Sequence, residues 1–93
     1  MQQDFLVHAA DDVVGVAVHD IEPGPAVRGR VQNGAAFELA VTEPVPLGHK
    51  VALRDIAAGQ PVVKYGVVIG RATQDIAAGD HVHVHNLKGE RWT

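Results

Sequence analysis

Asp55-Ile56-Ala57-Ala58-Gly59 and Asp75-Ile76-Ala77-Ala78-Gly79 are identical segments whose starts differ by 75 − 55 = 20 residues, and Asp20-Ile21-Glu22-Pro23-Gly24 is a looser copy. In each segment the Asp can accept a hydrogen bond from a main-chain N–H two or three residues later, which opens a single turn. The Ile can anchor that turn in a core, and the Gly can adopt the positive φ that releases the chain into the next strand. Three such units are too few for a solenoid. The segments therefore predict three tight turns within one architecture.

Short runs rich in valine lie between these turns, and no stretch longer than one turn has helical periodicity. Gln32-Asn33-Gly34 is typical of a hairpin turn. Residues 43–48 are expected to be extended, because their prolines restrict the residues that precede them. The predicted fold class is all-β. The runs expected to form strands are residues 5–8, 13–18, 27–31, 35–41, 51–54, 62–66, 68–72 and 81–86.

Size and composition limit the class of protein. The chain has 93 residues, so we expect a single domain over residues 1–93. It contains no cysteine, which excludes disulfides and thiolate chemistry. Its net charge of −3, without a run of Lys or Arg, argues against a nucleic-acid partner. No apolar run approaches the ~20 residues of a membrane span, and no basic leader opens the chain, so a cytoplasmic protein is expected.

The strict alternation of His81-Val82-His83-Val84-His85-Asn86 predicts a strand, with its valines on one face and its histidines on the other. On such a strand His83 and His85 lie about 6.5 Å apart, a spacing at which two imidazoles can converge on one metal ion. His81 and His85, about 13 Å apart, could not easily share one. The alternative is that these rings form a polar face or pack at a subunit interface, since no Asp, Glu or Cys stands beside them.

His49-Lys50 follows a proline-stiffened segment and a glycine, so its loop is expected to be held in place. A His/Lys pair suits proton transfer and the binding of a carboxylate or sulfonate. The alternative interpretation is an exposed loop charge. His8, His19 and Arg54 are expected to be ordinary polar positions.

Three motifs occur in a fixed order: Gly48-His49-Lys50, Lys64-Tyr65-Gly66 and His83-Val84-His85-Asn86. In this set, and over nearly the whole chain, the sequence resembles the SAF domain of the altronate/galactarate dehydratase family. The resemblance implies a β-clip, a compact, bent arrangement of short strands. His81 lies outside the matched motif and is expected to be structural, as is Lys64-Tyr65-Gly66 for the most part.

Fused members of that family carry this domain ahead of a large catalytic region. The resemblance therefore implies a small subunit that acts with a separate large (beta) lyase subunit on a small anionic 2-hydroxy acid. The expected reaction is the elimination of sulfite from (2R)-3-sulfolactate to give pyruvate. The alternative substrate is a sugar acid such as altronate or galactarate, with water as the leaving group. An alternative of another class is a non-catalytic SAF binding module.

The resemblance also implies which residues belong to the site. Residues expected to act in catalysis are His49, Lys50, His83, His85 and Asn86, and those expected to contact a metal are His83 and His85. The implied cofactor is a divalent metal, iron in the first instance, held mainly by the large subunit. A domain with so few large side chains offers little cavity of its own, so this chain is expected to supply one wall of the active site.

Overall fold

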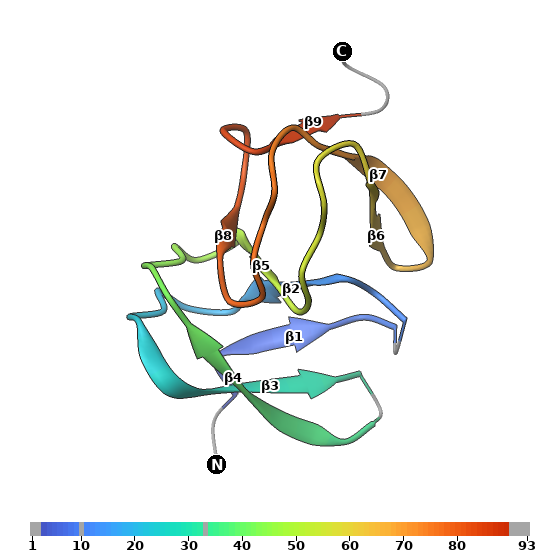
Figure 1. The fold of residues 1–93 in the computed structure, drawn as a ribbon. Coiled ribbons are helices and arrows are strands. Elements are labelled where there is room, and N and C mark those ends of the chain that lie inside the picture. The colour runs from blue at the N-terminus through green and yellow to red at the C-terminus, as the bar shows by residue number, and fades with distance from the viewer. Residues whose placement is uncertain (1–2, 10, 33, 90–93) are drawn as a thin grey trace.

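The computed structural model describes residues 3–9, 11–32 and 34–89, which form nine strands joined by turns (Figure 1). No helix occurs within these ranges, and the predicted all-β class is confirmed. It follows that no described helix is long and apolar enough to cross a membrane. The strands are β1 (Phe5–Val7), β2 (Val14–Ala17), β3 (Gly24–Val31), β4 (Ala36–Val41), β5 (Lys50–Ala52), β6 (Pro61–Lys64), β7 (Val67–Ala72), β8 (His81–Val82) and β9 (Leu87–Gly89).

The strands form two sheets. Six of them pair in the order β4-β3-β1-β2-β5-β8, and three pair in the order β6-β7-β9. Only β1 and β3 run parallel; the other pairs among the described strands are antiparallel. In Figure 1 the smaller sheet lies at the upper right, above the curled larger sheet. Val13 ties the two sheets together, because its N–H donates to the Val63 carbonyl and its carbonyl accepts from Leu53.

Two hydrophobic cores lie on opposite faces of the central strands. Side chains alternate along a strand, so Val51 of β5 enters one core and the adjacent Ala52 enters the other. β5 thereby contributes side chains to both cores. The first core consists of Phe5, Val7, Ala17, Ile21, Val27, Val41, Val45 and Val51, and the second of Val14, Ala52, Ile56, Val62, Ala72, Ile76 and Val82.

The two identical Asp-Ile-Ala-Ala-Gly turns cross each other. Ile56 and Ile76 exchange two main-chain hydrogen bonds of 2.7 and 2.8 Å. Asp55 accepts the N–H of Ala78, and Asp75 accepts the N–H of Ala58, each at 2.9 Å. The prediction that each Asp caps its own turn is therefore wrong, because each carboxylate caps the opposite turn.

The local cap of each turn comes instead from the residue after the glycine. Gln60 accepts the N–H of Ala57 through its side-chain oxygen, and Asp80 accepts the N–H of Ala77 through a carboxylate oxygen, both at 2.9 Å. Each cap satisfies a main-chain donor that would otherwise be left without a partner at the turn. In both turns the main-chain N–H of the third residue is thus capped by the polar side chain three positions later.

The looser copy at Asp20 crosses a turn that the sequence reading missed. Ile21 forms a bridge with Val45, and Asp20 accepts the N–H of Leu47 at 2.9 Å. Val45 is held in this bridge, and Leu47 and Gly48, the latter with a φ of +83°, then form a turn. The expectation that residues 43–48 are extended is therefore wrong at Leu47 and Gly48. The third residue of the segment 44–48 is Pro46, which has no N–H to cap.

Two other predictions need adjustment at their edges. Gly24, expected to end a turn, begins β3 together with Pro25, and a register shift between Gly24 and Val27 accommodates this proline in the strand. The β3–β4 hairpin is present, with the N–H of Gly34 donating to Val31. Its predicted turn includes Asn33, which lies outside the described residues.

Gly59 and Gly79 provide a matched pair for testing the crossed turns. Both have positive φ, +86° and +90°, but a Cβ at Gly59 would meet open space whereas one at Gly79 would collide with the Ala40 carbonyl oxygen. Gly59→Ala should cost about 1 kcal/mol of folding free energy from backbone strain alone. Gly79→Ala should cost a further 1–3 kcal/mol or so, because β4 must move. Urea unfolding of both variants measures the difference, and equal losses would contradict the close approach of the turn to β4.

Candidate functional site

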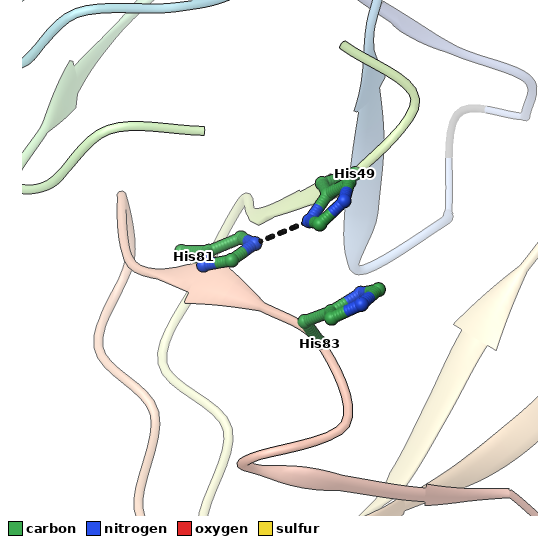
Figure 2. Close-up of side chains that lie close together, drawn as sticks. All are labelled: His49, His81 and His83. Carbon is green, nitrogen blue, oxygen red and sulfur yellow. Dashed lines mark hydrogen bonds between the residues drawn. The ribbon is translucent and has the colours of Figure 1, made fainter. Parts of the chain in front are cut away.

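The register of β5 against β8 brings three histidines to one face. Lys50 pairs with Val82 and Val51 pairs with His81, so one further step along both strands sets His49 opposite His83. His49, His81 and His83 therefore lie on the same side as Val51, at the rim of the first core. Figure 2 shows the three rings side by side. We call these three residues the histidine cluster.

The rings of the histidine cluster contact one another directly. Nδ1 of His49 lies 2.8 Å from Nε2 of His81, a hydrogen bond in which one ring donates and the other accepts (Figure 2). The ring of His83 stacks on that of His49, with centroids 3.9 Å apart and an interplanar angle of 18°. An imidazole–imidazole hydrogen bond needs an unprotonated acceptor nitrogen, so at least one of the bonded rings is neutral.

Burial and mutual repulsion disfavour the charged forms of His81 and His83. Partial burial, and then the charge of His49, lower the pKa of both His81 and His83 below the ordinary value of 6.5. The carboxylate of Glu43 acts in the opposite direction on the pKa of His81. At neutral pH His81 and His83 are consequently neutral, which is the form that accepts a proton or binds a metal ion.

The strand predicted for residues 81–86 ends at Val82, so that prediction is wrong from His83 onward. Asn86 explains the change. Its side chain, only 3% exposed, accepts the N–H of His83 at 2.9 Å and donates to the His81 carbonyl at 2.8 Å. Residues 83–86 therefore form a turn, and Val84 is 82% exposed instead of sharing a face with the buried Val82. Asn86 positions the two histidines that flank Val82; its catalytic role stays a prediction.

The turn changes which histidines can share a ligand. His81 and His85, expected to lie too far apart, have ring centroids separated by 5.3 Å. His81 belongs to both groups of described residues whose donor atoms fall within 4.8 Å of one another: the histidine cluster, and Glu43 with His81 and His85. Neither group contains both His83 and His85. The strand spacing used to pair His83 with His85 does not apply to this turn, and their role as metal ligands stays a prediction. The expectation that no carboxylate is near is wrong, because Glu43 lies beside His81 and His85.

The donor atoms of the histidine cluster suit a divalent transition metal. Neutral imidazole nitrogen is a preferred ligand of zinc, iron and copper, and three such ligands leave further coordination positions open. The hydrogen bond between His49 and His81 would be replaced on binding, because both nitrogens would then face the ion. The residues therefore fit the implied metal, in a set that includes His83 but not His85.

Lys50 lies beside the cluster but faces the other side of β5. It pairs with Val16 and with Val82, and the Val82 side chain lies in the second core. Burial, and then the nearby charge of Lys64, lower the pKa of the Lys50 amine. Lys50 in turn contributes to the lowered pKa of His83. The structure thus brings His49, Lys50 and His83 together. His85 is exposed and lies beside the cluster, with its ring centroid 5.3 Å from that of His81.

A separate hollow of about 390 Å³ lies at the crossed turns and contains none of the predicted site residues. Its carboxylates, Asp55, Asp75 and Asp80, already cap main-chain N–H groups. We therefore assign this hollow to the architecture of the turns.

Glu43 and His81 were missed by sequence reasoning for one reason. Both become neighbours of the site through pairings between distant segments, and Thr42 holds Glu43 there by donating its main-chain N–H to Gly79 and its hydroxyl to Asp80. Only the register of β5 against β8, which the sequence does not display, could have indicated His81 as the diagonal neighbour of His49.

Comparison with known proteins gives two groups of relatives. The alpha subunit of (2R)-sulfolactate sulfo-lyase from Chromohalobacter salexigens is 47% identical, over 99% of this chain and 100% of that protein. The corresponding subunit from Paracoccus pantotrophus is 46% identical over 64% of this chain and 90% of that protein.

Altronate dehydratases form the second group. Those of Bacillus subtilis and Escherichia coli are 39% and 46% identical over 95% and 92% of this chain, which spans only 16% of each of them. Residues 3–90 match the altronate/galactarate dehydratase SAF domain. The resemblance drawn from the three ordered motifs is therefore confirmed, and the chain belongs to the altronate/galactarate dehydratase SAF domain family.

Proposed function

We propose that this chain is the small (alpha) subunit of a (2R)-sulfolactate sulfo-lyase, acting with a large (beta) subunit in the cytoplasm. The observation that carries the proposal is 47% identity to such an alpha subunit along the full length of both chains. The reaction removes the proton from the hydroxyl-bearing carbon of (2R)-3-sulfolactate. The C–S bond then breaks, sulfite leaves with the electron pair, and the resulting enol takes up a proton at its terminal carbon and loses its hydroxyl proton to become pyruvate.

A second candidate is the small subunit of a sugar-acid dehydratase. It is favoured by the altronate dehydratases that match this chain at 39% and 46% identity. The two reactions share the loss of a proton next to a carboxylate and differ in the leaving group, sulfite or water. Assaying both substrates with one preparation separates them.

The geometry suggests what this chain contributes to the elimination. As long as no metal ion occupies the cluster, the neutral His83 and the hydrogen-bonded pair of His49 and His81 can accept and pass on a proton at the edge of β5. Lys50 supplies a positive charge beside them that can offset an anionic group of the substrate. The remaining walls, with the principal base, belong to the large subunit in this proposal.

The proposal includes a divalent metal, iron in the first instance, at the interface of the two subunits. His49, His81 and His83 are the residues of this chain that would hold it, replacing the earlier pairing of His83 with His85. When bound, such an ion polarises the substrate carboxylate and stabilises the charge that develops on it. The chain's own residues would then position the substrate and exclude water.

The purified chain alone should release no sulfite from sulfolactate, because its histidine cluster forms only one wall of the site. The complex with a large subunit should release sulfite and pyruvate in equal amounts. Sulfite and pyruvate assays on the chain, the large subunit and their mixture make this comparison. Sulfite release by the chain alone would contradict the proposal that the large subunit is required. Water loss from altronate without sulfite release from sulfolactate would favour the second candidate.

His49→Ala and His83→Ala should each lower kcat by about 10²-fold or more in the complex, the usual contribution of a proton-transferring group. His19→Ala is the matched control, since His19 pairs with Asp4 away from the cluster and its loss should leave kcat unchanged. Steady-state kinetics, with size-exclusion chromatography to verify that the complex persists, provides the measurement. Wild-type kcat in both cluster variants would remove the histidines from the mechanism.

Lys50→Ala should lower kcat/KM by about 10-fold, corresponding to about 1.4 kcal/mol of transition-state binding. The same variant should raise the pKa of His83, because it removes a positive charge that disfavours the imidazolium form. Proton NMR titration of the histidine ring protons, in chain freed of metal, reports that pKa. A His83 pKa that stays unchanged or falls would show that Lys50 does not act on the cluster.

A further inference from the structure

Glu43, His81 and His85 form a second group of donor atoms next to the histidine cluster. One donor atom from each of the three side chains lies within 4.8 Å of the other two. The ring centroids of His81 and His85 are 5.3 Å apart. Ligand atoms on opposite sides of a zinc-sized ion are separated by about 4.2 Å, twice the usual bond length. Small side-chain rotations therefore suffice to bring all three donors to one ion.

The fold positions these side chains but does not use their donor atoms. Thr42 is hydrogen-bonded to the residues just before β8 through its main-chain N–H and its hydroxyl, which holds Glu43 close to His81. Asn86 folds back the turn after β8, which brings the ring of His85 to that of His81. Within the described residues, neither the Glu43 carboxylate nor the His85 ring makes a hydrogen bond or an ion pair. Both donors are thus available to a ligand.

His81 also has a nitrogen to offer. Its Nε2 shares a hydrogen bond of 2.8 Å with Nδ1 of His49. The two nitrogens of an imidazole point in different directions, so Nδ1 of His81 faces away from His49 (Figure 2). An ion bound at Nδ1 leaves the Nε2–H to donate to His49. Metal-bound histidines usually donate their other ring N–H in this way, because the hydrogen bond fixes the tautomer and the ring orientation.

Two differences favour this group over the histidine cluster in the isolated chain. An ion in the cluster must displace the hydrogen bond between His49 and His81, whereas an ion beside Glu43 leaves it in place. The cluster offers three uncharged rings, whereas Glu43 adds a negative charge that attracts a divalent cation. Filling both positions at once would require His81 to give up its last ring proton. One ion, beside Glu43, is therefore the favoured state of the chain by itself.

We propose that Glu43, His81 and His85 form a binding site for one divalent first-row transition-metal ion, with His81 coordinating through Nδ1. Two imidazoles and one carboxylate are a ligand set that suits iron(II) and zinc. Three protein ligands leave positions open, and the exposure of His85 leaves solvent access to them. The site is additional to the ion that the proposed function gives the histidine cluster, and it does not depend on the lyase reaction.

The site has a consequence for the histidine cluster. While the ion is bound beside Glu43, the hydrogen bond between His49 and His81 persists, and the ring of His83 carries no metal ion. The cluster then keeps the neutral nitrogens that proton transfer requires. Metal binding and proton transfer thereby use different atoms of His81.

The test measures the binding of Co²⁺ and Zn²⁺ to the full chain, freed of metal by a chelator and carrying no polyhistidine tag. Isothermal titration calorimetry should show one strong site per chain. Mg²⁺ should bind at least about 10-fold more weakly, because it prefers ligands that are all oxygen. Long-range ¹H–¹⁵N spectra of the histidine rings in the Zn²⁺-bound chain should identify Nδ1 as the ligated nitrogen of His81.

Four variants locate the ion. Glu43→Gln and His85→Ala should each weaken Co²⁺ binding about 10-fold or more, since even an outer-shell partner contributes about that much. Glu38→Gln removes the same charge from an exposed position of β4 and should leave the affinity unchanged. His83→Ala removes a residue that belongs to the cluster alone and should also leave it unchanged. Dispersed amide spectra verify that each variant is folded.

Three results would overturn the proposal. The first is Co²⁺ affinity that survives both Glu43→Gln and His85→Ala but is lost in His83→Ala, which would place the ion in the cluster. The second is ligation of His81 through Nε2, and the third is binding of Co²⁺ and Zn²⁺ no tighter than that of Mg²⁺. Because no measurement involves a substrate, a failure of the lyase assay leaves this site in place, and a failure here leaves the lyase proposal in place.

Discussion

The crossing of turns is the interaction on which this small fold depends. Ile56 and Ile76 are joined by two main-chain hydrogen bonds, and Asp55 and Asp75 each cap the turn that the other begins. The same device joins Ile21 to Val45. Each crossing buries an aliphatic pair in a different core, so two short contacts organise a chain that has few large side chains and no disulfide.

The site follows from one antiparallel pair within that frame. Because β5 and β8 are only 3 and 2 residues long, their register alone decides which side chains meet. It puts the histidines on the face of the first core and Lys50 on the face of the second. The imidazoles and the Lys50 ammonium group are thereby placed on opposite faces of one strand, yet the charge of Lys50 still lowers the pKa of His83.

The sequence was sufficient to predict much of the local structure but not which strands and turns lie against each other. Turn residues and valine-rich runs were sufficient for the all-β class, and the ordered motifs were sufficient for the family. The alternation at residues 81–86 misled because periodicity carries no information about Asn86, whose two hydrogen bonds fold the segment back. The role of Asp55 and Asp75 was half right: they cap a turn, but the partner lies some 20 positions away and could not be deduced from one copy.

Pro46 gives the turn at residues 44–48 a property that the two Asp-Ile-Ala-Ala-Gly turns lack. His49, Gln60 and Asp80 occupy equivalent places, since each follows the turn glycine and its carbonyl accepts the N–H of a buried alanine. Gln60 and Asp80 must use their side chains to satisfy the N–H of Ala57 and Ala77. Pro46 has no main-chain N–H, so the side chain of His49 is not needed to cap the turn at residues 44–48. Removing one hydrogen-bond donor from a repeated motif thus opens a position for a functional residue without loosening the scaffold that presents it.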